Sequence, residues 1–420
     1  AIDNIPPELQ VKIFSEVSRR PWHEMNPSVS QSSDSTWLRA FRTKISLPLI
    51  CRSTWWAASK VLYKDVVIRR MGQFLPLART MSFEQPPSSD LHLMVNSLRM
   101  DTCIVLLEAV DECRAALATI LSRCPNLTSI THRSHPAFDF ADAFQHSVAL
   151  TDNVLNPTWF VSPSSTGNVL LSVVGSQLTH LDIHADLSNS ASVHALHVVL
   201  QHTPCLRVLV AWRWNAALIS VVINSHLRDD GIIEPHHDFH TLILPSLLDL
   251  RVDCGTMSFL PRFIAKYWTL PSLQQLTVGI GANPMDPMEI VERFGAGLLF
   301  LQFIPDTGDA CFTPDQQDRL DSYCPLLEHL VLPALKPAAI AQHPIRSPSL
   351  KWLDIWTVLP KVFSDYPTLS WQTGLRPLVV SPTDSAAPVL ASVRILDDSD
   401  AFDLDWTSAA RAEWPMLFHP

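Results

Sequence analysis

Glycine is scarce in this sequence, with 11 residues among 420, whereas proline occurs 33 times. Glycine supplies the positive backbone angles that tight hairpin turns need, so its scarcity argues against a β fold built from hairpins. Proline ends helices and strands because it has no backbone N–H to donate. This balance indicates many short elements separated by proline-containing turns.

Charged side chains are also few, at 17% of the residues, and the formal net charge is −10. No long cluster of Lys and Arg is present, so we expect no nucleic-acid partner. No apolar run reaches the about 18 residues that a transmembrane helix needs, so we expect no membrane partner. Hydrophobic residues make up 47% of the chain, which is enough to bury a large core.

The eight cysteines lie far apart and include no Cys-x-x-Cys pair. In a chain of this length they indicate buried thiols in a reducing compartment rather than a disulfide framework. The sequence therefore predicts a protein of the cytoplasm or nucleus. The sequence starts at Ala1, and whether a leader preceded that residue stays open.

The sequence lacks the common catalytic motifs. It contains no Gly-x-x-x-x-Gly-Lys, Gly-x-Gly-x-x-Gly, His-Glu-x-x-His or Gly-x-Ser-x-Gly. His236, His237, Asp238 and His240 are metal-ligand types, but ligands adjacent on one loop lack the spacing of a structural zinc site. We therefore predict a non-catalytic protein with no metal and no cofactor. An enzyme with a cleft near residues 229–240 remains the less favoured alternative.

The first seventy residues contain three short amphipathic segments. The first begins at Pro6 and repeats Leu9, Ile13 and Val17 every four residues, which predicts one apolar stripe on a helix. A polar stretch follows at 26–36, where we expect a loop. Two further apolar segments, Ile45–Cys51 and Thr54–Tyr63, complete a set that is too small for a large core of its own.

These segments resemble the F-box in the form common in mushroom-type fungi. The resemblance rests on three ordered blocks, Ile5–Phe14, Leu49–Ser53 and Val61–Val66. It departs from the family pattern in two ways, because Thr54 stands where a Trp is usual and the first loop is longer. The resemblance implies docking to a Skp-type adaptor, and through it to a cullin. The residues implied to contact the adaptor, or to support that surface, are Ile5, Pro6, Leu9, Ile13, Phe14, Leu49, Ile50 and Cys51. The alternative is a helical cap on the domain that follows.

The remainder of the chain repeats a short phrase, often Pro-x-Leu-x-x-Leu-x-hydrophobic. Five of the eight steps between successive first leucines lie between 23 and 29 residues, which is typical of a leucine-rich repeat. Helical patterns precede several phrases, at Asp111–Cys124, Ala191–His202, Met257–Trp268 and Pro314–Tyr323. The nine phrases are Leu127–Ile130, Leu178–Ile183, Leu206–Leu209, Leu247–Val252, Leu273–Val278, Leu298–Phe303, Leu327–Leu332, Leu350–Ile355 and Leu390–Ile395.

The predicted fold class is therefore α/β. We expect a small three-helix F-box module over residues 1–70. We expect an irregular leucine-rich-repeat-like solenoid over 71–420, with a parallel concave sheet, irregular insertions and an acidic C-terminal segment.

Alternation along each strand predicts which side chains face a partner. The leucines should point into the core, so the intervening residues should lie exposed on the concave face. Exposed tryptophans are typical of interaction hot spots, although they can also fill gaps between neighbouring side chains. The expected partner-binding residues are Trp212, Trp214, Arg251, Trp352, Asp354 and Trp356.

The function that the resemblance implies is substrate recognition for a Skp–cullin–F-box ubiquitin ligase. The solenoid would bind a protein target, whose identity the sequence leaves open. A protein-binding scaffold with no ubiquitin role is the alternative.

Overall fold

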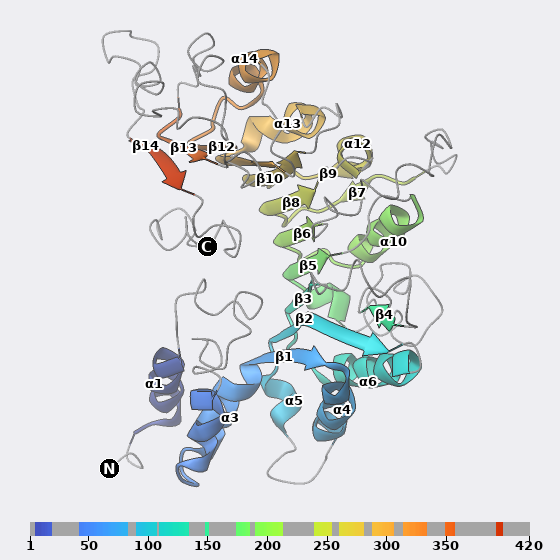
Figure 1. Cartoon of the computed structure of the whole chain (residues 1–420), viewed down its shortest axis with the longest axis vertical. Coiled ribbons are helices and arrows are strands. Elements are labelled where there is room, and N and C mark those ends of the chain that lie inside the picture. Colours follow the sequence, from blue (N-terminus) through green and yellow to red (C-terminus); the bar gives the residue numbers. More distant parts are fainter. Residues whose placement is uncertain are drawn as a thin grey trace, which may run out of the picture. The chain divides into compact units, whose positions relative to one another are not determined.

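The structure is a computed structural model of the chain. It describes residues 5–18, 42–82, 90–106, 109–133, 148–150, 174–184, 190–212, 239–253, 260–280, 288–305, 314–333, 349–357 and 392–397. The described residues fall into two compact units, the first ending at Leu178 and the second beginning at Thr179. Figure 1 shows the elements of both units in chain order.

The first unit combines helices with a short sheet. Strands β1, β2 and β3 pair in parallel in that order, and β4 pairs antiparallel with β2. Its elements are α1 (Pro7–Ser18), η3 (Leu47–Leu49), α3 (Trp55–Lys64), β1 (Asp65–Arg70), η4 (Met71–Gln73), α4 (Phe74–Ser82), α5 (Leu91–Met94), β2 (Ser97–Leu106), α6 (Val110–Arg123), β3 (Ser129–Arg133), β4 (Val148–Leu150) and η8 (Gly175–Gln177).

The second unit is built around a parallel sheet with the order β5-β6-β8-β10-β11-β12-β13-β14, and β7 and β9 form a separate parallel pair. In Figure 1 its helices lie along one face of these strands. Its elements are β5 (His180–His184), α10 (Ser190–Gln201), β6 (Val208–Trp212), β7 (Leu242–Ile243), β8 (Asp249–Asp253), α12 (Leu260–Tyr267), β9 (Trp268–Thr269), β10 (Gln275–Ile280), α13 (Met288–Phe294), η10 (Gly295–Gly297), β11 (Phe300–Pro305), α14 (Pro314–Tyr323), β12 (His329–Pro333), β13 (Trp352–Thr357) and β14 (Ser392–Asp397).

The α/β class and the large parallel sheet are confirmed. The expected helices at Asp111–Cys124, Ala191–His202 and Pro314–Tyr323 are present as α6, α10 and α14. The antiparallel pairing of β4 departs from the parallel sheet that we predicted. The separation of residues 1–70 as a module stays a prediction, and so does the identity of the units as F-box and solenoid.

Leucines hold the sheet of the second unit together. In this sheet, each of the strands β5, β6, β8, β10, β11, β12 and β13 places one leucine opposite the leucine of its neighbour, as the register shows. All are buried, as the sequence predicts, and burying one such side chain contributes about 1.5–3 kcal/mol. We call this series the leucine row, and it consists of Leu181, Leu209, Leu250, Leu276, Leu301, Leu330 and Leu353.

The turns before these strands stack on one another. Arg207 O accepts the backbone N–H groups of both Leu248 and Asp249, at 2.8 and 3.0 Å. The same double acceptance recurs before six other strands, namely β3, β6, β10, β11, β12 and β13. In addition, the Ser272 hydroxyl donates to Pro245 O of the preceding turn at 2.6 Å. Proline therefore lies in the turn before the strand, where no backbone N–H is needed for strand pairing. Its carbonyl accepts a hydrogen bond from the next turn.

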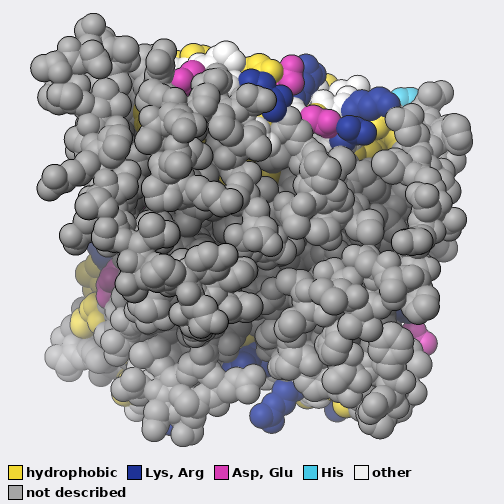
Figure 2. Space-filling model, turned by 45° about the horizontal axis from the view of Figure 1, so that its top comes forward, with side chains coloured by type: hydrophobic (Ala, Val, Ile, Leu, Met, Phe, Trp, Pro, Cys, Tyr) yellow, Lys and Arg dark blue, Asp and Glu magenta, His cyan; other side chains and the backbone are white. Residues whose placement is uncertain are grey.

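Two further observations concern the helices and the surface of the described residues. None of the helices in these ranges has the length and apolar character needed to cross a membrane. Along the upper edge of the view in Figure 2, basic and acidic side chains are interspersed.

Two glycines in short helices test the packing. A Cβ atom at Gly295 would lie 2.6 Å from Tyr323 O and 2.8 Å from Cys324 Sγ, whereas one at Gly72 would meet nothing within 4 Å. Because the Tyr323 carbonyl belongs to the backbone, we expect Gly295→Ala to lower the free energy of unfolding by about 1–3 kcal/mol. Gly72→Ala is the matched control, expected to change stability by less than about 1 kcal/mol. Urea denaturation measures both, and equal effects would contradict the packing described.

Candidate functional site

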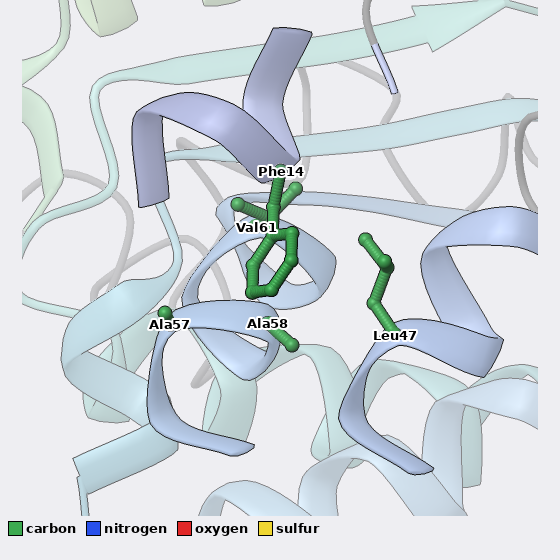
Figure 3. Packing of buried hydrophobic residues seen from close by; sticks show 5 residues of the cluster. All are labelled: Phe14, Leu47, Ala57, Ala58 and Val61. Carbon is green, nitrogen blue, oxygen red and sulfur yellow. The ribbon is translucent and has the colours of Figure 1, made fainter. Parts of the chain in front are cut away.

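Three helical segments of the first unit pack around one small core. Phe14 of α1, Leu47 of η3 and Ala57, Ala58 and Val61 of α3 are buried against one another. Figure 3 shows these five side chains converging between the ribbons. We call α1, residues 42–50 and α3 the helical cluster. Because two of the five side chains are alanines, the core buries little apolar area.

The apolar stripe of α1 faces away from this core. Leu9 and Ile13 are 52% and 46% exposed, whereas Gln10 and Phe14 are buried. The Gln10 side-chain amide donates to Ile5 O at 2.8 Å, which ties the start of the helix to the preceding residues. The orientation of α1 therefore leaves its two large aliphatic side chains in solvent.

The second segment also exposes its largest apolar side chains. Residues 42–46 are helical and lead into η3. Leu47 turns inward, whereas Leu49 is 80% and Ile50 is 58% exposed. Ile45 is exposed as well. The helical cluster thus presents exposed aliphatic side chains from two neighbouring segments, and such surfaces mark interaction sites.

Thr54 links the second segment to α3. Its hydroxyl donates to Cys51 O at 3.1 Å, and the Cys51 thiol lies 3.1 Å from Ser53 Oγ and 3.2 Å from Thr54 Oγ1. Thr54 is fully buried, so a large Trp side chain would not fit at this position without rearrangement. The departure from the F-box pattern at Thr54 therefore has a local structural role.

The residues expected to contact an adaptor fall into three groups. Leu9, Ile13, Leu49 and Ile50 are exposed, and we call them the docking residues. Pro6 is also exposed, and Ile5 and Cys51 are half-buried. Phe14 supports the surface from beneath, because it lies in the core.

The face of the second unit's sheet opposite the leucine row is also buried at its centre. The register places Asp182, Val210, Arg251, Thr277, Gln302, Val331 and Asp354 in one line across the strands. The last five of these, which we call the opposite-face row, are all buried, with Arg251 at 9% and Asp354 at 1% exposure. The expectation that Arg251 and Asp354 lie exposed is therefore wrong. Strands of a parallel sheet are commonly buried on both faces, which the alternation pattern cannot reveal.

Two buried pairs contain the two charged residues of the opposite-face row, Arg251 and Asp354. Arg251 contacts both carboxylate oxygens of Asp249, with Nη2 to Oδ2 at 2.8 Å. His329 Nε2 lies 2.8 Å from Asp354 Oδ2 on the neighbouring strand. The Phe300 ring meets the His329 ring edge-on, with centroids 5.0 Å apart. Pairing of this kind makes burial of charged groups tolerable.

His329 is a polar residue that sequence reasoning missed. It precedes Leu330 in its phrase, at the ladder position that Asp249 occupies in β8 and Trp352 in β13. A histidine held by a carboxylate can serve as a base, but only where a substrate reaches it. At 1% exposure His329 offers no open position, so the pair acts by joining β12 to β13.

The expected tryptophans are described unequally. Trp352 is half-buried, and the Lys351 ammonium lies 5.7 Å from its ring centroid. The backbones of Trp212 and Trp356 end β6 and precede the last residue of β13 respectively. Their side chains lie outside the described residues, and so does the whole of Trp214.

Other candidate chemistry receives no support among the described residues. No group of three or more His, Cys, Asp or Glu side chains there could hold a metal ion. Residues 229–238 lie outside the described ranges. Burial raises the pKa of both Cys124 and Cys324 to about 12, so these thiols stay protonated and unreactive at neutral pH. The prediction of buried thiols is confirmed for these two and for Cys113, whereas Cys205 is exposed.

Comparison with known proteins does not assign the chain to a family. No family model matches it, and no curated protein matches it. A crystal structure of a protein from Bacteroides fragilis aligns over 67% of this chain and 63% of that chain, with 12% identity and a TM-score of 0.33. The alignment thus spans less than two thirds of that protein, and at this TM-score it indicates neither fold nor function.

The His329–Asp354 pair predicts a stability effect. Asp354→Ala removes the carboxylate that a buried histidine contacts, so we expect unfolding free energy to fall by on the order of 3 kcal/mol. Glu289→Ala is the control, because it removes the partner of Arg262 in an ion pair at the surface, where losses stay below about 1 kcal/mol. Chemical denaturation compares the two variants. An Asp354→Ala protein as stable as the control would refute a structural role for the pair.

Proposed function

We propose that this chain is the substrate-recognition subunit of a Skp–cullin–F-box ubiquitin ligase and performs no chemical step itself. The observation that carries the proposal is the exposure of Leu9, Ile13, Leu49 and Ile50. These are residues that the F-box resemblance assigns to adaptor contact. Large aliphatic side chains that remain in solvent on a small helical cluster need a partner to bury them.

Under this proposal the helical cluster is the F-box. It docks in an apolar groove of a Skp-type adaptor, which connects it to a cullin. Each aliphatic side chain that becomes fully buried contributes about 1.5–3 kcal/mol. Leu9, Ile13 and Ile50 are already about half-buried in the free chain, so the four docking residues supply only part of the binding energy and further contacts contribute the rest.

The second unit is the proposed leucine-rich-repeat-like solenoid. The order of its sheet supports this assignment, because its eight parallel strands follow one another in the sequence apart from β7 and β9. Helices α10, α12, α13 and α14 lie between those strands in the chain. A unit of this kind holds a target while the ligase delivers ubiquitin, which raises the effective concentration of the target at the catalytic partner.

The target contacts change in one respect from the sequence-based hypothesis. Arg251 and Asp354 are buried in pairs within the protein, so we assign them to support of the sheet. Trp212, Trp214, Trp352 and Trp356 remain the proposed target-binding residues. We place the complex in the cytoplasm or nucleus, where ubiquitin ligases of this class act.

Adaptor binding tests the proposal directly. We expect the chain to co-elute with a co-expressed Skp-type adaptor from a mushroom-forming fungus in size-exclusion chromatography. Leu9→Asp combined with Ile13→Asp should weaken the complex at least about a hundredfold, because two apolar contacts are replaced by buried carboxylates. The control is Leu326→Asp, which changes another exposed aliphatic side chain in a turn of the second unit.

The outcomes separate cleanly. Loss of co-elution for the Leu9→Asp, Ile13→Asp variant alone supports the proposal. Failure of the unaltered chain to co-elute would remove the F-box assignment and leave the helical cluster as a cap. Equal weakening by Leu326→Asp would show that the contact is nonspecific.

Ubiquitin transfer distinguishes a ligase subunit from a scaffold. In a reconstituted system with adaptor, cullin, E1 and E2, a bound target should acquire ubiquitin only when this chain is present. The tetra-alanine variant of Trp212, Trp214, Trp352 and Trp356 should retain adaptor binding but lose target modification. Retained target modification would exclude these tryptophans, and adaptor binding without any cullin-dependent transfer would favour the scaffold.

A further inference from the structure

Charge is distributed unequally along the chain. Residues 1–70 contain 11 Lys and Arg against six Asp and Glu, a net charge of +5. The other 350 residues contain 20 against 35, a net charge of −15. The segment that includes the helical cluster is therefore basic, although the chain as a whole is acidic.

The structure shows where this charge lies in the helical cluster. On α1, exposed Lys12 is three residues from Leu9 and adjacent to Ile13, so all three share the solvent-facing side. Arg42 is exposed one helical turn before Ile45. Exposed basic residues thus accompany the exposed aliphatic side chains on both segments that carry docking residues.

The third segment of the cluster, α3, also places exposed basic residues beside an exposed apolar side chain, which here is a tryptophan ring. Trp56 of α3 is 43% exposed, and the Lys60 ammonium lies 5.1 Å from its ring centroid. Lys64 is exposed one turn further along the same helix. Trp56 and Lys60 are not among the residues that the F-box resemblance assigns to adaptor contact.

Few acidic side chains offset these groups. Within the described parts of 5–65, only Glu8, Glu16 and Asp65 are acidic. The basic side chains in the same ranges are Lys12, Arg42, Lys44, Arg52, Lys60 and Lys64. A second copy of the cluster would bring like charges together as its apolar side chains met. The charge therefore favours a partner of the opposite sign over self-association.

We propose that the helical cluster recognises an acidic face of its adaptor, with Lys12, Arg42 and Lys60 steering association and Trp56 extending the contact. This inference rests on the proposed adaptor docking and adds the charge of the partner and further contact residues. The basic and the apolar side chains have different roles because they act over different distances. Charges act over about 10 Å at 0.1 M salt and set the association rate, whereas apolar contacts act on touching and set the dissociation rate.

Association kinetics at two salt concentrations test this proposal. The probe is the purified fungal Skp-type adaptor, immobilised and exposed to the full chain at about 0.02 M and about 0.5 M NaCl. The test variant carries Lys12→Glu and Lys60→Glu. We expect its association rate constant to fall about tenfold at low salt, to approach the unaltered value at high salt, and its dissociation rate constant to change less than about threefold.

The chain supplies a matched control. Lys266 lies 5.1 Å from the Tyr267 ring in α12, as Lys60 does from Trp56, and Arg207 is exposed in a turn. The variant Lys266→Glu, Arg207→Glu makes the same change in net charge outside the helical cluster. Because steering depends on where the charge lies, its association rate should change less than about twofold. The milder Lys12→Gln, Lys60→Gln variant, expected to slow association about threefold, serves if the Glu variant folds poorly.

The possible results bear on the two proposals separately. Adaptor binding at a rate that neither salt nor the Lys12 and Lys60 substitutions alter would overturn the acidic-face inference and leave the ligase proposal standing. Absence of adaptor binding by the unaltered chain would remove both. If the control variant slowed association as much as the test variant, the effect would come from net charge. That result would refute a specific role for the basic residues of the cluster.

Discussion

The leucine row is the constraint on which the second unit depends. Each of the strands β5, β6, β8, β10, β11, β12 and β13 places a buried leucine beside the leucine of its neighbour. Side chains alternate between the faces of a strand, so this alignment also aligns the residues of the opposite face. A shift of one residue in any strand would move its leucine to the opposite face of the sheet, out of line with the leucine row. The register between β12 and β13 therefore determines that His329 meets Asp354, whereas Arg251 reaches Asp249 because the two residues lie on the same face of β8.

The helical cluster differs from the second unit, because its large aliphatic side chains are mostly exposed rather than buried. Its core contains Phe14, Leu47, Val61 and two alanines, while five large aliphatic side chains are exposed: Leu9, Ile13, Ile45, Leu49 and Ile50. An amphipathic helix normally turns its aliphatic stripe inward, but α1 turns Phe14 inward and leaves Leu9 and Ile13 outside. The free cluster thus leaves unburied some of the apolar surface that could have stabilised it. That surface is what a partner would use, which is why we locate the docking function here rather than on the sheet.

Sequence patterns predicted the repeated parts of the fold and missed features that depend on tertiary packing. The leucine phrases identified β3 and all eight strands of the second unit's main sheet, because each phrase repeats the same alternation. Strands β1, β2, β4, β7 and β9 carry no such phrase and were missed. The pattern of α1 showed an apolar stripe but not which face the core would take. The burial of Arg251 and Asp354 depends on packing over the opposite face, which no local pattern encodes. Trp56 lies two residues after Thr54, and only its exposure beside Lys60 identified it as a surface feature.

A small core and a large exposed apolar surface link the stability of the helical cluster to its occupancy. A partner that binds only the folded cluster stabilises it by an amount that grows with partner concentration, about 2.7 kcal/mol when the partner is at a hundred times its dissociation constant. The core is small because Ala57 and Ala58 are two of its five residues. The stabilisation by a bound partner is comparable to that from burying one additional leucine in such a core. The small core therefore limits the stability of the free cluster, whereas the exposed docking residues would provide energy for the proposed docking. Replacing Leu9 or Ile13 by a polar residue would leave the core intact because neither residue contributes to it. The exposed aliphatic surface and the core can consequently be altered independently, so the proposed docking function can be tested without changing the fold.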